Sequence, residues 1–480
     1  MPSTRAIGRA ILIALARVLT SLLCLWSGFR AVSDDDYSRV VIAARFAQHP
    51  TLDPSGTSWL PAPFWLYGVP MGLFGDSLLT ARVVAVLAGA ASAVLVWQAA
   101  RVLGLSERAA WWGALGAVVL PYGAWLSAAT VPEAPTAALI LFGVVSLGRP
   151  EARLRALGGL ALGAACFCRY EAWAPAFTFG VLTAVEAART RRKALWLAAA
   201  FATVPIGLWL LHGVVRHGDA FFFVARVSQY RAALGGEQHG LGSALLGVGF
   251  SLVRFEPELF VVTALALGWS WRGGESPFGP TAWRPLMALG ALVLFLIAAD
   301  ASGGSATHHP ERSLLPVFWF MALLAAGLLV QLAAAEKAWR LPAVTLPLAL
   351  GASLLLRPDV RKTFVDRQEE EQVGGVLRSL NADRVALDTD DFGFFAVQAA
   401  LGAGKSWALS AHDPRRPEPP RPATTIELAR RLGEHEGARW LVTPRDRQAL
   451  ALPLGELRLR TPRFAVIQLN HLDPPTAARD

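Results

Sequence analysis

Charged residues are scarce in this chain. Only 17% of its 480 residues are Asp, Glu, Lys or Arg, whereas 54% are hydrophobic. Soluble globular domains are usually about 25% charged, so the chain has too few ions for a surface that faces only water. This scarcity excludes an ordinary soluble enzyme and favours a protein whose apolar surface lies in lipid.

Cysteine is also rare. The three cysteines, Cys24, Cys166 and Cys168, all lie in apolar segments, so neither a disulfide framework nor a zinc-ligand pattern is predicted. The net charge of +9 comes without a compact Lys/Arg tract with interleaved aromatic residues, which excludes nucleic acid as a partner. Basic residues lie instead in short loops between apolar blocks, as is typical of membrane proteins.

Long apolar blocks are what the chain has in abundance. Each is about 17 to 25 residues long, enough to cross the hydrocarbon core of a bilayer as a helix. The blocks lie at about residues 11–29, 78–103, 108–126, 131–148, 155–170, 172–189, 194–214, 243–270, 284–300, 313–334 and 341–356. The sequence therefore predicts an α-helical multi-pass membrane protein with about eleven spans, which lie in membrane lipids.

The first apolar block has a second interpretation. Ala31 and Ser33 are small residues around a potential cleavage site, as in a secretory signal peptide. The apolar run is longer than a usual signal core, so we expect an uncleaved anchor.

The basic loops predict the orientation of the chain. With the N-terminus in the cytoplasm, the loop "TRRK" at Thr190 to Lys193 lies inside and the acidic triplet Asp34 to Asp36 lies outside. Arg216, Arg226 and Arg231 fall outside and oppose the rule. We expect a multi-pass protein of the bacterial plasma (inner) membrane with a periplasmic or extracellular C-terminus.

The character of the sequence changes after about residue 356. Residues 357–480 are charged, Pro-rich in places and contain no apolar block of span length. The segments "RVALDT", "SWALSA", "ARWLVTP" and "RFAVIQLN" predict short strands, and residues 425–432 predict an amphipathic helix. We therefore expect a transmembrane domain at residues 1–356 and a small non-cytoplasmic α/β domain at residues 357–480.

The acidic triplet follows the first apolar block. Ser33 and Asp36 fit the pattern of a capping box that opens a helix. Capping explains Asp36 but gives Asp34 and Asp35 no structural task, which makes these two carboxylates candidates for chemistry.

Several motifs, taken in order, resemble the GT-C glycosyltransferases, and most closely family 39 and the aminoarabinose-transferase-like branch. These are multi-pass enzymes that use lipid-phosphate-linked sugars. The likeness begins with Asp35-Asp36-Tyr37, then Pro61-Ala62-Pro63-Phe64-Trp65, then Gly75-Asp76-Ser77 and Arg82. It continues with Arg169-Tyr170-Glu171 in "CFCRYEAW", with the loop "HGDAFFFVARVSQYR" and with Arg312 in "HHPERSLLP". Ala62 splits the proline pair of the family motif, and the likeness covers about residues 10–335.

The resemblance implies an inverting transfer of a sugar from a polyprenyl phosphate to a lipid, glycan or protein acceptor of the cell envelope. Such a transfer needs a base that takes the proton of the acceptor. Asp35 aligns with the catalytic acid of the family, and Asp34 and Asp36 are the alternatives. Glu133 matches a position where relatives often carry another acid; its other interpretation is a solvated loop residue ahead of a helix.

The departing phosphate requires cations, for which the fork of donors on arginine is suited. We assign Arg226, Arg231 and Arg312 to this task, and Arg226 and Arg231 could instead be ordinary loop charges. Arg82 and Tyr37, from the resembling motifs, are assigned to the same donor site. Arg169 and Glu171 could simply pair with each other near the membrane.

A metal site is not predicted. His308, His309 and Glu311 are close in sequence, but adjacent histidines point apart, and a polar loop cap explains them better. No cofactor is assigned, although a need for a divalent metal ion stays open.

Two other functions compete with a hexosyl- or pentosyltransferase. A membrane transporter or lipid flippase of envelope precursors would show internal repeats and midplane polar residues, which the sequence lacks. A non-catalytic scaffold would have no need for acidic and basic residues in loops on the same face. The glycosyltransferase interpretation explains these loops and is preferred.

Overall fold

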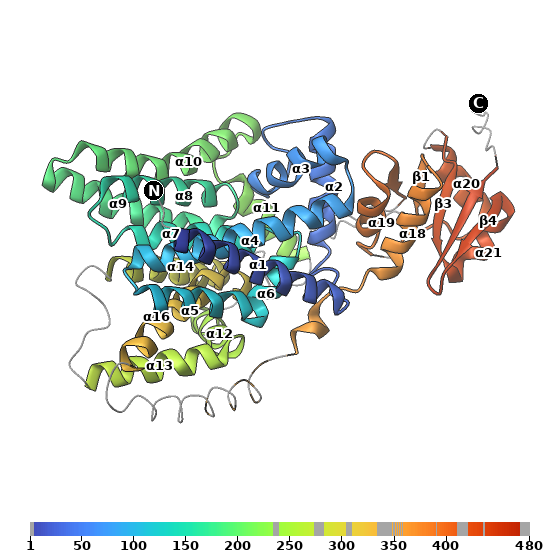
Figure 1. The fold of residues 1–480 in the computed structure, drawn as a ribbon. Coiled ribbons are helices and arrows are strands. Elements are labelled where there is room, and N and C mark those ends of the chain that lie inside the picture. The colour runs from blue at the N-terminus through green and yellow to red at the C-terminus, as the bar shows by residue number, and fades with distance from the viewer. Residues whose placement is uncertain are drawn as a thin grey trace. The chain divides into compact units, whose positions relative to one another are not determined.

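The structure is a computed structural model of the chain and forms two compact units (Figure 1). It describes residues 4–233, 240–272, 283–303, 310–333, 348, 351, 353, 355, 357, 359–389, 391–409, 421–434 and 437–470. The helical unit consists of Met1–Phe29, Ser55–Pro63 and Ala85–Lys362. The mixed unit consists of Arg30–Pro54, Phe64–Val84 and Thr363–Asp480.

The helical unit is built from apolar helices joined by short loops. Its main helices are α1 (Thr4–Trp26), α4 (Leu78–Leu103), α5 (Glu107–Val119), α6 (Pro121–Ala128), α7 (Glu133–Ser146), α8 (Ala152–Cys166), α9 (Trp173–Thr190), α10 (Lys193–His217), α11 (Phe222–Ala233), α12 (Leu241–Arg254), α13 (Pro257–Arg272), α14 (Trp283–Ala301), α15 (Pro310–Ser313) and α16 (Leu315–Ala333). Helix α4 begins in the mixed unit and continues in the helical unit.

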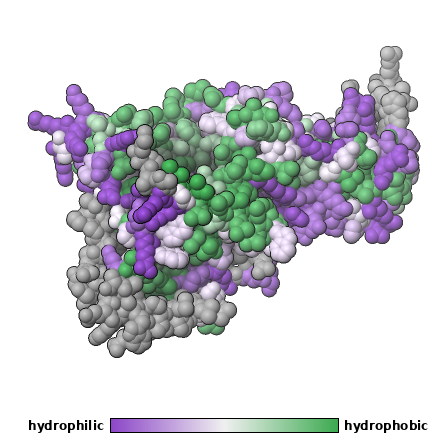
Figure 2. All heavy atoms as spheres, in the orientation of Figure 1, coloured by the Kyte–Doolittle hydropathy of each residue, from purple (hydrophilic) through white to green (hydrophobic). Residues whose placement is uncertain are grey.

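Four helices of the described residues are long and apolar enough to cross a membrane: α1, α4, α10 and α14. Helices α5 and α6 together make a fifth candidate, bent by 67°. Side chains such as Ile11 and Leu15 on α1 are more than half exposed, and hydrophobic side chains cover much of the visible surface of the helical unit (Figure 2). An apolar surface of this kind suits contact with lipid. The predicted membrane protein is supported, whereas the number of eleven spans stays a prediction.

Two of the predicted spans are not single continuous helices in the structure. The segment 108–126 is not one straight helix, because Pro121 begins α6 after the bend. The segment 243–270 is divided into α12 and α13, and buried Glu256 lies between them and accepts a hydrogen bond from the Tyr122 amide. The predicted span at 341–356 lies largely outside the described residues.

Helix α8 packs unusually closely against two of its neighbours, α7 and α10. A Cβ atom added at Gly158 would lie 1.7 Å from Oγ of Ser146 on α7. A Cβ atom at Gly159 would lie 2.2 Å from the carbonyl oxygen of Ala198 on α10, and one at Gly163 would lie 2.3 Å from that of Phe201. These glycines therefore let three helices approach to backbone contact.

The mixed unit contains a five-stranded sheet in the order β2-β1-β3-β5-β4. The strands are β1 (Val385–Leu387), β2 (Ser406–Ala408), β3 (Trp440–Pro444), β4 (Gly455–Arg460) and β5 (Phe464–Leu469). Strand β1 pairs in parallel with β2 and β3, while β5 pairs antiparallel with β3 and β4. Parallel pairs need crossover connections, and these are supplied by helices.

Helices cover both faces of this sheet. On one face, Val385 and Leu387 of β1 pack with apolar residues of α18 (Gln368–Ser379) and α19 (Phe394–Leu401). On the other face, Ala386 packs with residues of α20 (Thr425–Glu434) and α21 (Gln448–Ala451). The alternation follows from the two-residue period of a strand and confirms the predicted small α/β architecture.

The mixed unit also includes N-terminal segments. Helix α2 (Asp35–Gln48) packs against α19. Helix α3 (Ala62–Phe74) approaches α2 so closely that a Cβ atom at Gly68 would lie 2.7 Å from the carbonyl oxygen of Ala43. The acidic triplet therefore shares a compact unit with the C-terminal sheet, although the sequence assigns the two segments to different domains.

Candidate functional site

The acidic triplet opens helix α2, and its three carboxylates have different surroundings. Asp36 is buried, and its Oδ2 accepts hydrogen bonds from the amides of Val32 at 3.1 Å and Ser33 at 3.2 Å. The bond from the Ser33 amide is the one that the predicted capping box expects of this carboxylate, but the N-cap of α2 is Asp34 rather than Ser33, so the bond fastens the chain just ahead of the helix. Asp36 therefore has a structural task.

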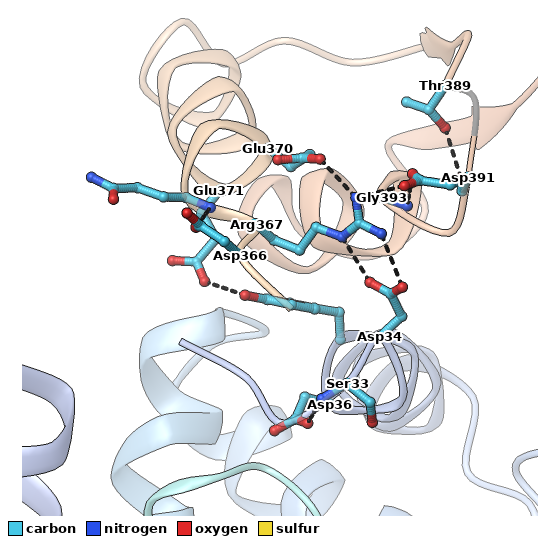
Figure 3. A network of polar contacts seen from close by, with 12 residues as sticks. Ser33, Asp34, Asp36, Asp366, Arg367, Glu370, Glu371, Thr389, Asp391 and Gly393 are labelled. Carbon is cyan, nitrogen blue, oxygen red and sulfur yellow. Dashed lines mark hydrogen bonds and ion pairs between the residues drawn. The ribbon is translucent and has the colours of Figure 1, made fainter. Parts of the chain in front are cut away.

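Asp34 is bound by an arginine from the far end of the chain. Nε of Arg367 lies 2.8 Å from Oδ1 of Asp34, and Nη2 lies 2.9 Å from Oδ2 (Figure 3). The remaining nitrogen, Nη1, contacts Glu370 at 3.0 Å and Asp391 at 2.8 Å. The prediction that Asp34 has no structural task is wrong, because both of its oxygens are engaged by one guanidinium group.

A second set of contacts lies one turn further along α2. Oη of Tyr37 donates to Oε1 of Glu371 at 2.6 Å. Arg82, in the first turns of α4, donates to Oε2 of Glu371 at 3.0 Å. Tyr37 and Arg82, both assigned to the donor site from sequence, are thus brought together on one carboxylate that sequence analysis missed. We call the contacts made by Arg367 and Glu371 the open network.

The open network shifts the ionisation of its members. Burial alone would lower the pKa of Arg367, but hydrogen bonds to Asp34 and Asp391 raise it above its ordinary value. Burial raises the pKa of Tyr37, and the neighbouring Glu371 raises it further. Burial would raise the pKa of Asp391, but the Gly393 amide and Arg367 hold it below the ordinary value. At neutral pH the guanidinium group is charged and the phenol is neutral.

Asp35 differs from its two neighbours. Its side chain is exposed, and among the described residues it has no hydrogen-bonding or ion-pairing partner. A carboxylate that is to accept a proton from a bound molecule must have an accessible oxygen. Of the three carboxylates in the triplet, Asp35 meets this condition.

The helical unit has a network of its own, which we call the closed network. Nη1 of Arg169 lies 2.7 Å from Oε1 of Glu133, and its Nε pairs with Glu171. Ser313 bonds to both Arg169, at 3.3 Å, and Glu171, at 3.1 Å. The predicted pairing of Arg169 with Glu171 is confirmed. The interpretation of Glu133 as a solvated loop residue is wrong, since Glu133 is buried at the start of α7.

The three arginines assigned to the phosphate lie in the helical unit. Arg231 of α11 is buried and lies 3.2 Å from Asp300 of α14. Arg226 donates to the carbonyl oxygen of Gly56 at 2.7 Å. Arg312 is buried on α15, next to Ser313 of the closed network. Arg231 is therefore not a solvated loop charge, whereas Arg226 is half-buried on α11. The role of all three towards a donor stays a prediction.

The carboxylates of the open and closed networks converge on arginine side chains. Asp34, Glu370 and Asp391 surround Arg367, and Glu133 and Glu171 surround Arg169. His308 and His309 lie outside the described residues.

Searches against family models and against curated proteins found no match for this chain. The fold is similar to the crystal structure of ArnT from Cupriavidus metallidurans bound to undecaprenyl phosphate, with a TM-score of 0.59 and 15% sequence identity over 97% of this chain and 98% of that one. The apo structure of the same protein gives a TM-score of 0.55 and 14% identity over the same shares. The chain therefore shares the fold of that protein over nearly its whole length, in agreement with the fold that the sequence resemblance implied.

Proposed function

We propose that this protein is an inverting membrane glycosyltransferase. It transfers a hexosyl or pentosyl group from a polyprenyl-phosphate donor to a lipid, glycan or protein acceptor of the cell envelope. The reaction takes place at the non-cytoplasmic face of the bacterial inner membrane, with the N-terminus in the cytoplasm.

The observation that carries the proposal is the likeness to ArnT over 97% of this chain and 98% of the other. A single shared module could belong to many functions. Here the likeness includes both the helical unit and the mixed unit, and the comparison protein is bound to undecaprenyl phosphate. A fold that accommodates a polyprenyl phosphate supports a donor of the same class.

Asp35 is the residue that we propose as the general base. It takes the proton of the acceptor hydroxyl or amine as that group attacks the anomeric carbon, and the bond from that carbon to the donor phosphate breaks. One base is sufficient, because an inverting transfer is a single displacement. The exposed carboxylate of Asp35 supports this assignment, whereas Asp34 and Asp36 are held by Arg367 and by backbone amides.

In the proposed mechanism, arginine side chains bind the phosphate of the donor. Guanidinium groups bind phosphate oxygens through two parallel hydrogen bonds. Arg231 and Arg312 are buried in the helical unit, where the low dielectric strengthens such contacts. Arg226 and Arg82 are further candidates, and Tyr37 would donate its hydroxyl group.

The test uses the full chain purified into nanodiscs. It is supplied with undecaprenyl-phosphate-linked sugars and with extracts of envelope lipid and glycan, and mass spectrometry detects the glycosylated product. The wild-type chain should produce it, and Asp35→Asn should lower the rate by about 100- to 10,000-fold, the usual effect of losing a general base. Asp359→Asn, which alters a different exposed carboxylate, is the matched control and should keep full activity.

Two outcomes would contradict the proposal. Full activity of Asp35→Asn together with loss in Asp34→Asn would move the base to Asp34. Movement of intact lipid-linked sugar across a vesicle membrane, with no new glycosidic product, would instead support the transporter or flippase alternative.

A further inference from the structure

The contacts between helix α18 and helix α2 join segments that are more than 300 residues apart in the chain. Arg367 immediately precedes α18 and holds Asp34 at the start of α2. Val373 and Leu377 of α18 are fully buried in the core of the sheet. Arg367 is therefore carried by a rigidly packed element rather than by a free loop.

All three nitrogens of the Arg367 guanidinium group donate hydrogen bonds, and these use four of its five N–H donors. Two nitrogens bind the two oxygens of Asp34, and the third binds Glu370 and Asp391. Only 8% of the Arg367 side chain is exposed. A bidentate pair fixes orientation as well as distance, so this contact restricts how the first turn of α2 is turned about its axis.

A second side-chain contact, made by Tyr37, also holds helix α2. Asp34 and Tyr37 are three residues apart, so they lie on the same face of the helix. Both are held by residues at the start of α18, Asp34 by Arg367 and Tyr37 by Glu371. Successive residues of a helix are rotated by about 100°, which turns Asp35 away from the tied face. The two ties thereby decide which carboxylate of the triplet is left exposed.

The capping arrangement is consistent with this division of tasks. Asp34 occupies the N-cap position of α2 but makes no side-chain capping bond. Asp36, in the first turn of the helix, accepts instead from the amides of Val32 and Ser33, which lie just ahead of the N-cap. Arg367 therefore engages Asp34 without competing with the start of the helix.

We propose that Arg367 is a positioning residue of the C-terminal segment, which orients the first turn of α2 through Asp34 and so presents Asp35 to the acceptor. This inference rests on the proposed function for its catalytic consequence. It gives the sheet-containing C-terminal region a task in the reaction: it holds the helix that carries the base.

The test compares Arg367→Gln, Arg367→Lys and Arg463→Gln in the full chain in nanodiscs. Arg463 contacts Glu370 at 3.2 Å, as Arg367 does, but not Asp34, so Arg463→Gln is a matched control. Two quantities are measured: the kcat and KM of sugar transfer, and hydrogen–deuterium exchange of peptides from the first turn of α2.

Arg367→Gln should lower kcat by about 100-fold, the effect of a small misplacement of a catalytic group, with little change in the KM for the donor. Its α2 peptides should exchange faster than those of the wild type. Arg367→Lys keeps the charge but loses the bidentate contact, and should fall between Arg367→Gln and the wild type. Arg463→Gln should match the wild type in both measurements.

The inference is overturned if Arg367→Gln keeps its kcat, or if it loses kcat without faster exchange in α2. If the wild-type chain transfers no sugar, the proposed function fails, but hydrogen exchange still tests whether Arg367 orients α2. Unchanged exchange in Arg367→Gln then overturns the orienting role of Arg367, and faster exchange supports that role. Asp34→Asn should reproduce the exchange result of Arg367→Gln, and the double variant should exchange no faster than either.

Discussion

The open network of the mixed unit and the closed network of the helical unit use the same chemistry for different ends. Each places one arginine among carboxylates, Arg367 in the first and Arg169 in the second. In the closed network both carboxylates are paired with the arginine and Ser313 completes the set. In the open network the arginine occupies Asp34, while the adjacent Asp35 stays exposed.

This difference indicates that the closed network stabilises the fold, whereas the open network holds a group in place for a reaction. Buried carboxylates that are all paired are costly to disturb but have little capacity left for an incoming molecule. A network that fully engages one carboxylate and leaves its neighbour exposed keeps a group in place for chemistry. We therefore expect changes in the closed network to act mainly on stability and changes in the open network to act mainly on turnover.

The largest effect on stability should come from Arg169→Gln. It leaves Glu133 and Glu171 without the guanidinium group with which they pair, and loss of one partner of a buried pair costs about 3–5 kcal/mol. Thermal unfolding of the purified protein measures the loss. Arg216→Gln, which removes an exposed arginine of α10, is the control.

Removing the carboxylates as well sharpens this test. Adding Glu133→Gln and Glu171→Gln to Arg169→Gln should restore part of the stability, because no unpaired buried charge remains. A single Arg169→Gln variant as stable as the wild type would show that the closed network does not stabilise the helical unit.

A smaller effect is expected from Arg312→Lys and Arg231→Lys. Lysine keeps the charge but cannot bind phosphate through a planar fork. A charged hydrogen bond contributes about 1.5–3 kcal/mol, so the rate of sugar transfer should fall by roughly 10- to 100-fold while the unfolding temperature changes little. Wild-type turnover in both variants would remove these arginines from the donor site.

Asp36→Ala should have a milder effect. Losing a side chain that accepts backbone hydrogen bonds at a helix start costs about 0.5–2 kcal/mol, and the loss should be seen as faster hydrogen exchange at the start of α2. Asp36→Asn keeps an acceptor oxygen and should lose less stability and retain much of the transfer activity. A dead Asp36→Asn variant with normal stability would make Asp36, rather than Asp35, the base.

The smallest effect concerns pH. Because the pKa of Asp391 is held below its ordinary value of 3.8, its carboxylate contributes stability that is present above that value and lost as pH falls through the lowered pKa. The stability difference between the wild type and Asp391→Asn should be constant near neutral pH and shrink below about pH 4. Unfolding temperatures of both proteins, measured across this pH range, test the prediction. A stability difference that grows on acidification would contradict the lowered pKa of Asp391.

The sequence predicts local features of the fold well and long-range ones poorly. Four of the five strands are expected from their β-branched and aromatic residues. Strand β4, with the sequence "GELRLR", is missed because its charged residues alternate at an exposed edge. The break between α12 and α13 is missed because hydropathy counts apolar residues and does not register the buried Glu256.

The site follows the same rule. The pairing of Arg169 with Glu171 and the hydrogen bond from the Ser33 amide to Asp36 join residues close in sequence, and both are predicted from it. Arg367 was missed because it lies 333 residues from Asp34, and in the sequence it is an arginine ahead of an acidic, amphipathic helix. The nearest available signal was the run Glu369 to Glu371, whose carboxylates need cationic partners when the helix is packed.

The glycines of α8 have a consequence for how the helical unit is assembled. In a bilayer, lipid tails solvate apolar side chains as well as a protein interior does, so helices associate mainly through close van der Waals packing. Gly158, Gly159 and Gly163 supply that packing towards α7 on one side and α10 on the other. These helices fall in the predicted spans 131–148, 155–170 and 194–214, and if all three insert, we expect them to associate soon afterwards and to move as one body, with no lipid chain between them. A single methyl group at Gly159 would be enough to separate two of them.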